Sequence, residues 1–107
     1  MPVLICLANP NAASAVIDYL RIHGLDTERA DDAELARRLL RFRSYDALIC
    51  DSDGPTLARI AKRRHAHTRT VVLSTERPRK AGDASIDFEL VKPLPLSVIL
   101  GCLSPTA

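Results

Sequence analysis

Aromatic residues and long apolar runs are scarce in this sequence. Its 107 residues include two Phe, two Tyr and no Trp. Because single-stranded nucleic acid is bound largely by stacking bases on aromatic side chains, we expect no DNA or RNA binding of that kind. The sequence has no apolar run of 18 residues for a membrane span and does not open with a signal-peptide pattern. We therefore expect a cytoplasmic protein that contacts no membrane.

Cysteine, glycine and histidine are equally sparse. Cys6, Cys50 and Cys102 are an odd number, and each lies in an apolar run, which predicts buried free thiols. The four glycines are isolated, so the sequence has no glycine-rich phosphate loop. His65 and His67 are two candidate ligands without a third nearby, whereas zinc needs roughly three or four. No metal site is expected.

The length of 107 residues predicts one domain, residues 1–107. A chain of this length can bury enough apolar surface in one core to fold without disulfides. The net charge of +2 is unevenly distributed. Residues 59–80 contain eight basic residues and one acid, a formal charge of +7, and the remainder carries −5. This asymmetry predicts a basic face that attracts a nucleotide, a nucleic acid or an acidic partner, or else a solvated helix face.

Short, continuous apolar runs alternate with helical patterns. Residues 3–7, 47–50 and 71–73 are apolar throughout, which is typical of strands buried on both faces of a parallel sheet. Residues 25–30 and 88–91 are weaker strand candidates. The repeated order of strand and helix predicts an α/β fold with right-handed crossovers and helices on both faces of the sheet.

Capping residues mark where the first two helices begin. We expect the first to start at Asn11 as N-cap and to stop at Gly24. The second is expected to start at Asp31, with Glu34 completing a capping box and Leu35 in its buried stripe.

A third helix is expected to start with Pro55 in its first turn, with its basic residues outward, and a last helix to run from Leu96 to about Leu103. Residues 75–87 lack an apolar stripe, so a full helix is not expected there.

Three polar residues follow the predicted strands. Asp51, Ser74 and Lys92 each stand at the carboxyl end of a different strand, the edge of an open parallel sheet at which ligands bind. A carboxylate nucleophile, a hydroxyl donor and an ammonium group are the parts of a phosphoryl-transfer site.

The residues around these positions resemble the receiver domains of bacterial response regulators over nearly the whole chain. Residues 45–51 are similar to the strand that ends in the phospho-acceptor aspartate, here Asp51, and residues 71–75 to the strand that ends in the switch Ser/Thr, here Ser74. Residues 90–94 resemble the segment with the invariant lysine and its cis-proline, here Lys92 and Pro93.

The resemblance implies a CheY-like (flavodoxin-like) fold, a three-layer sandwich whose five-stranded parallel sheet has the order 2-1-3-4-5. It also implies a histidine kinase or another two-component signalling protein as partner, with the chain either a stand-alone regulator or part of a hybrid kinase. A homodimer through the last helix and strand is a further expectation, for which the helix 96–103 is apolar enough.

The sequence departs from the family pattern where that pattern binds Mg²⁺. The acidic pair after the first strand falls on Leu7 and Ala8, or one position later on Ala8 and Asn9, so no carboxylate is available unless Asp53 contributes. The segments 51–74 and 74–92 are shorter than is usual, which predicts shortened third and fourth helices. The aromatic switch position falls on Glu89.

Three functional hypotheses remain open. The first is a non-enzymatic, degenerate receiver in which Lys92 pairs directly with Asp51, so that Mg²⁺ binding and phosphorylation are impaired and the domain acts through protein–protein interaction. The second is a genuine phospho-acceptor at Asp51. The third is a sensor of an anionic ligand, such as a cyclic dinucleotide, through Arg77, Arg79 and Lys80.

Overall fold

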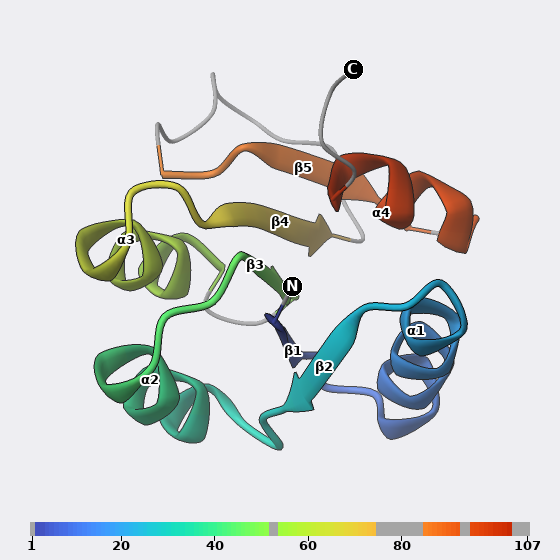
Figure 1. Ribbon diagram of the computed structural model, residues 1–107, viewed down its shortest axis with the longest axis horizontal. Coiled ribbons are helices and arrows are strands. Elements are labelled where there is room, and N and C mark those ends of the chain that lie inside the picture. The colour runs from blue at the N-terminus through green and yellow to red at the C-terminus, as the bar shows by residue number, and fades with distance from the viewer. Residues whose placement is uncertain (1, 52–53, 75–84, 93–94, 104–107) are drawn as a thin grey trace.

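The computed structural model describes residues 2–51, 54–74, 85–92 and 95–103. Five parallel strands form one sheet in the order β2-β1-β3-β4-β5, with helices on both of its faces (Figure 1). The strands are β1 (Pro2–Cys6), β2 (Asp26–Arg29), β3 (Ala47–Cys50), β4 (Arg69–Ser74) and β5 (Phe88–Val91). The helices are α1 (Pro10–Ile22), α2 (Ala33–Phe42), α3 (Gly54–Arg64) and α4 (Leu96–Leu103). The predicted three-layer architecture and strand order are confirmed.

Alternate residues of the central strands pack into two separate hydrophobic clusters, one on each face of the sheet. In β1, Val3 and Ile5 pack with residues of α1 and α4, whereas Leu4 and Cys6 pack with residues of α2 and α3. Successive side chains of a strand point to opposite faces of the sheet, so a strand covered by helices on both sides needs apolar residues at every position. This is the physical reason for the continuous apolar runs in the sequence.

The first two helices begin at different caps from those expected. The cap of α1 is Asn9, whose side chain accepts hydrogen bonds from the backbone N–H groups of Asn11 and Ala12. Pro10 then occupies the first turn, where its missing N–H costs nothing. The cap of α2 is Asp32, which accepts from the backbone N–H of Leu35. The predicted caps Asn11 and Asp31 were therefore wrong.

Other element boundaries differ by one or two residues. The α3 helix begins at Gly54, one residue before the predicted start, and β4 extends beyond the predicted 71–73 at both ends. Leu35 is 36% exposed, so its predicted burial was wrong. The expected short fourth helix falls mainly on residues 75–84, outside the described part of the chain. Within the described residues, no helix has the length and apolar character needed to span a membrane.

Two glycines have a structural requirement. Gly24 ends α1 with a φ of 83°, a left-handed conformation that other residues adopt at a cost. Gly54 is buried where α3 approaches the sheet, and a Cβ atom at this position would lie 2.7 Å from Cγ1 of Val72. A side chain there would therefore require Val72 or α3 to shift.

The edge strand β5 is connected to the rest of the domain through Asp87. Its Oδ2 atom accepts hydrogen bonds from Nζ of Lys62 at 2.6 Å and from the backbone N–H of Thr70 at 2.9 Å. Partial burial acts to raise the pKa of Asp87, but these donors outweigh it and lower the pKa below its usual 3.8. The ionised carboxylate thus links β5 to both α3 and β4.

Candidate functional site

The candidate site lies at the carboxyl edge of the sheet. Asp51 directly follows β3, Ser74 ends β4 and Lys92 directly follows β5. The strand order places β3, β4 and β5 side by side, so three segments far apart in the sequence meet at one edge (Figure 1). The structure therefore brings together the residues that the sequence singled out.

Both oxygens of the Asp51 carboxylate have hydrogen-bond donors. Nζ of Lys92 donates to Oδ2 at 2.9 Å, and the backbone N–H of Ala8 donates to Oδ1 at 3.0 Å. The Asp51 side chain is 10% exposed and the Lys92 side chain 31% exposed. Charge-assisted hydrogen bonds of this kind are stronger than those between neutral groups. The expected direct pairing of Lys92 with Asp51 is thus present.

The backbone fixes both partners of this ion pair. The N–H of Asp51 donates to the carbonyl oxygen of Cys6 at 3.3 Å, and the N–H of Lys92 donates to the carbonyl oxygen of Ser74 at 2.7 Å. Asp51 is thereby joined to β1, and Lys92 to β4. Ser74 is half-buried at this edge, and its backbone carbonyl contacts the ion pair by accepting the hydrogen bond from Lys92.

The two positions aligned with the family's acidic pair have different roles here. The Leu7 side chain is 2% exposed and belongs to the hydrophobic cluster between the sheet, α1 and α4. Ala8 is exposed and contributes its backbone N–H to Asp51. Asn9, the alternative in the shifted register, is occupied as the cap of α1.

Among the described residues, this edge of the sheet offers few ligands for a divalent cation. Mg²⁺ prefers oxygen ligands, usually including one or two carboxylates. Of the described residues that directly follow β1, β3 and β5, Asp51 alone carries a carboxylate, and both of its oxygens are engaged. No group of three His, Cys, Asp or Glu side chains suited to a metal occurs in the ranges that the structure describes.

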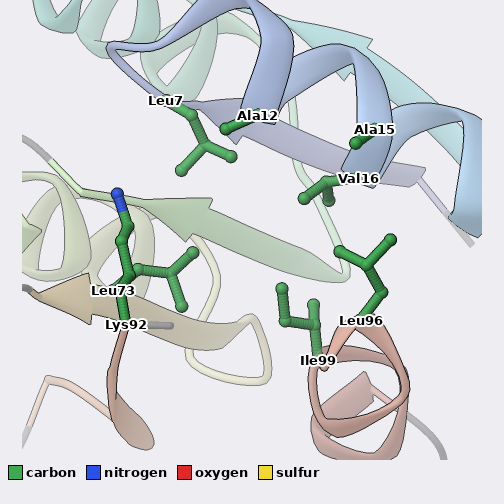
Figure 2. A pocket seen from close by; sticks show the side chains of 8 residues that line it. All are labelled: Leu7, Ala12, Ala15, Val16, Leu73, Lys92, Leu96 and Ile99. Atoms are coloured by element: carbon green, nitrogen blue, oxygen red, sulfur yellow. The ribbon is translucent and has the colours of Figure 1, made fainter. Parts of the chain in front are cut away.

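Beside the ion pair, a cavity of about 260 Å³ opens between α1 and α4. Figure 2 shows Leu7 and Val16 entering it from the β1 and α1 side and Leu96 and Ile99 from α4. Of the described residues that line it, Lys92 is the charged one and the others are apolar. The sequence did not predict this cavity.

The cysteines near the site are structural. Cys6, Cys50 and Cys102 are all free and buried, as the sequence predicted. Burial, together with the neighbouring Cys6 and Asp51, raises the pKa of the Cys50 thiol to about 12. A thiol with such a pKa stays protonated near neutral pH and is a poor nucleophile.

Lys62 of α3 is half-buried against Asp87, contrary to the expectation, whereas Arg59, Arg63 and Arg64 of α3 are exposed, as expected. Together with α2, the helix α3 forms an open groove of about 360 Å³, lined by Leu40, Arg41, Ile60, Arg63 and Arg64. The last turns of α2 and α3 lead to the amino ends of β3 and β4, so this groove lies at the opposite edge of the sheet from Asp51.

Five predicted positions lie outside the described residues: Asp53, Arg77, Arg79, Lys80 and Pro93. The ligand sensor that was based on Arg77, Arg79 and Lys80 therefore stays a prediction.

The sequence matches no family model and no curated protein. Structural similarity is extensive. The receiver domain of the Francisella response regulator 1452 superposes with a TM-score of 0.82 at 22% identity, covering 95% of this chain and 92% of that one. The receiver domain of the hybrid histidine kinase CckA gives 0.79 at 21% identity, with 97% and 100% coverage.

A response regulator protein from Burkholderia pseudomallei, solved with a phosphorylated aspartic acid, calcium and citrate, gives a TM-score of 0.78 at 20% identity. The match covers 96% of this chain and 66% of that protein. These similarities show that the chain has the receiver-domain fold of two-component response regulators.

Proposed function

We propose that this chain is a degenerate receiver domain, a non-enzymatic module that regulates a two-component pathway through protein–protein contacts and is phosphorylated poorly at Asp51. The observation that supports this most is that Lys92 and the backbone of Ala8 engage both Asp51 oxygens, and that the described residues directly after β1, β3 and β5 supply no second carboxylate. The negative charge of Asp51 is thus balanced by Lys92, and both of its oxygens have donors, without a metal ion or a phosphoryl group.

The chemistry of phosphoryl transfer supports the same conclusion. The transferring group carries negative charge on its oxygens, and a bound divalent cation stabilises that charge in the transition state. At this edge Lys92 supplies one positive charge, and Asp51 already neutralises it. An incoming phosphoryl donor would have to displace Lys92 from Asp51 without a metal ion to compensate, which should make the reaction slow.

The partner we propose is a histidine kinase or another two-component signalling protein. The fold supports this class, because similar domains occur both in a response regulator and in a hybrid histidine kinase. A phosphorylatable receiver is the competing proposal, since Asp51 follows the central strand β3 and its side chain is 10% exposed.

Intact-mass analysis after incubation with Mg²⁺ and acetyl phosphate separates the two proposals. We expect no adduct of one phosphoryl group on the wild-type chain. An adduct that forms within minutes, and that Asp51→Asn abolishes, would establish the phosphorylatable receiver instead.

A gain-of-function variant tests the physical reason. Ala8 is exposed and its backbone already contacts Asp51, so Ala8→Asp should place a second carboxylate at the site. We expect this variant to show Mg²⁺-dependent NMR shifts around Asp51 and to gain the phosphoryl adduct. Ala8→Asn is the matched control, because it has the same shape without the charge. Equal behaviour of the two variants would show that the missing acid is not what limits the site.

A further inference from the structure

The cavity between α1 and α4 has nearly uniform chemistry. In the part of the chain that the structure describes, eight residues line it: Leu7, Ala12, Ala15, Val16, Leu73, Lys92, Leu96 and Ile99. Seven of them offer only apolar side chains, and in Figure 2 these approach the cavity from the sheet, from α1 and from α4. Water in such a space finds few hydrogen-bond partners, so an apolar group should replace it favourably.

The volume sets the size of such a group. A cavity of 260 Å³ corresponds to roughly nine water-sized volumes of about 30 Å³ each. A chain or ring of about six to eight carbon atoms would therefore fill it. This is smaller than a nucleotide or a drug-sized ligand, whose pockets start at about 300 Å³.

Lys92 determines the polar end of the ligand. An ammonium group has three N–H donors, and in the described part of the chain its hydrogen-bond partner is Asp51. Figure 2 places its nitrogen atom on the Leu7 side of the cavity, with the aliphatic stem along the wall. The side chain is 31% exposed, so its remaining donors are accessible to an anion at this end.

We propose that this cavity binds a small amphipathic carboxylate, with six to eight carbons between α1 and α4 and its head group on Lys92. The carboxylate would share Lys92 with Asp51 and so compete for the contact that occupies the candidate site. Binding itself does not depend on the proposed function. Its effect on a signalling partner would rest on that proposal.

Calorimetric and methyl-NMR titrations with butanoate, hexanoate and octanoate test the binding. Each added methylene group buried in the cavity should tighten binding by about fourfold until the space is full. The methyl signals of Val16 and Ile99 should shift as hexanoate binds. Hexanol, which has the same chain without the charge, should bind at least tenfold more weakly, because hydrogen bonds to a charged group are strong.

Three variants locate the site. Ala12→Leu should fill the cavity, and Lys92→Met should keep the aliphatic stem while removing the ammonium group; each should weaken hexanoate binding at least tenfold. Arg37→Met is the matched control, because it removes an exposed positive charge from α2 on the other face of the sheet. It should leave the affinity unchanged.

Several results would overturn the proposal. Hexanol binding as tightly as hexanoate would refute the role of Lys92, and no dependence on chain length would refute the cavity. If the Val16 and Ile99 signals of the wild-type protein do not shift when hexanoate is added, the site is refuted. This result does not depend on whether Ala12→Leu folds. Failure here is distinguishable from failure of the proposed function, because the acetyl phosphate experiment is done without hexanoate or its longer homologues.

Discussion

Replacing Lys92 with methionine would show how strongly the ion pair stabilises the candidate site. Methionine keeps much of the aliphatic stem along the cavity but removes the 2.9 Å contact with Asp51. Exposed ion pairs contribute about 0.2–1 kcal/mol, whereas breaking a buried pair costs about 3–5 kcal/mol. Side-chain exposures of 31% and 10% place this pair between those limits. We expect Lys92→Met to lower the free energy of unfolding by about 1.5–2.5 kcal/mol at pH 7.

A double-mutant cycle with Asp51→Asn isolates the interaction. The free energy of unfolding of wild type, both single variants and the double variant would be measured by urea denaturation at constant m-value. A coupling free energy of about 1–2 kcal/mol is expected, and it should fall in high salt because the pair is partly exposed. A coupling below about 0.3 kcal/mol, the usual error of such cycles, would refute the view that Lys92 neutralises Asp51.

Three further predictions concern the surrounding fold. Gly54→Ala should lower stability by about 1–3 kcal/mol in urea denaturation, because the new Cβ would lie 2.7 Å from Val72; an unchanged midpoint would contradict this packing. The lowered pKa of Asp87 means that its ionised form stabilises the fold above pH 3.8, a contribution lost as the pH falls through the folded pKa. Asp87→Asn should accordingly be less stable than wild type at pH 7 and approach it in acid, as followed by the urea midpoint against pH. Cys50, with its pKa raised to about 12, should resist iodoacetamide at pH 8 in the folded protein, and rapid labelling detected by mass would show that it is accessible.

The layer architecture could be predicted from the sequence because strands buried on both faces need continuous apolar runs, which are visible in the sequence. Strands β1 and β3 are apolar at nearly every position, which is typical of strands that helices cover on both faces. Helix starts were harder to predict, because adjacent residues compete for the same role. Asp31 and Asp32 are equally good caps by type, and the backbone geometry selects Asp32.

The site could be predicted only where side chains carry the information. The absence of acids at Leu7 and Ala8 indicated that Lys92 would pair with Asp51, and the structure shows that contact. The second donor to Asp51 is the backbone N–H of Ala8. Every residue except proline has such a donor, so the residue type at position 8 could not predict this contact. The cavity depends on how closely α1 and α4 approach each other, which local sequence patterns do not specify.

The position of each strand within the sheet gives the two partners of the ion pair unequal freedom. Asp51 follows β3, which has neighbours on both sides, whereas Lys92 follows β5, at the edge of the sheet. Amide hydrogens of interior strands exchange with solvent through nearly global unfolding, and those of edge strands through smaller, more frequent openings. Any rearrangement of this site should therefore begin with Lys92 and β5, while Asp51 stays where β1 and β3 hold it.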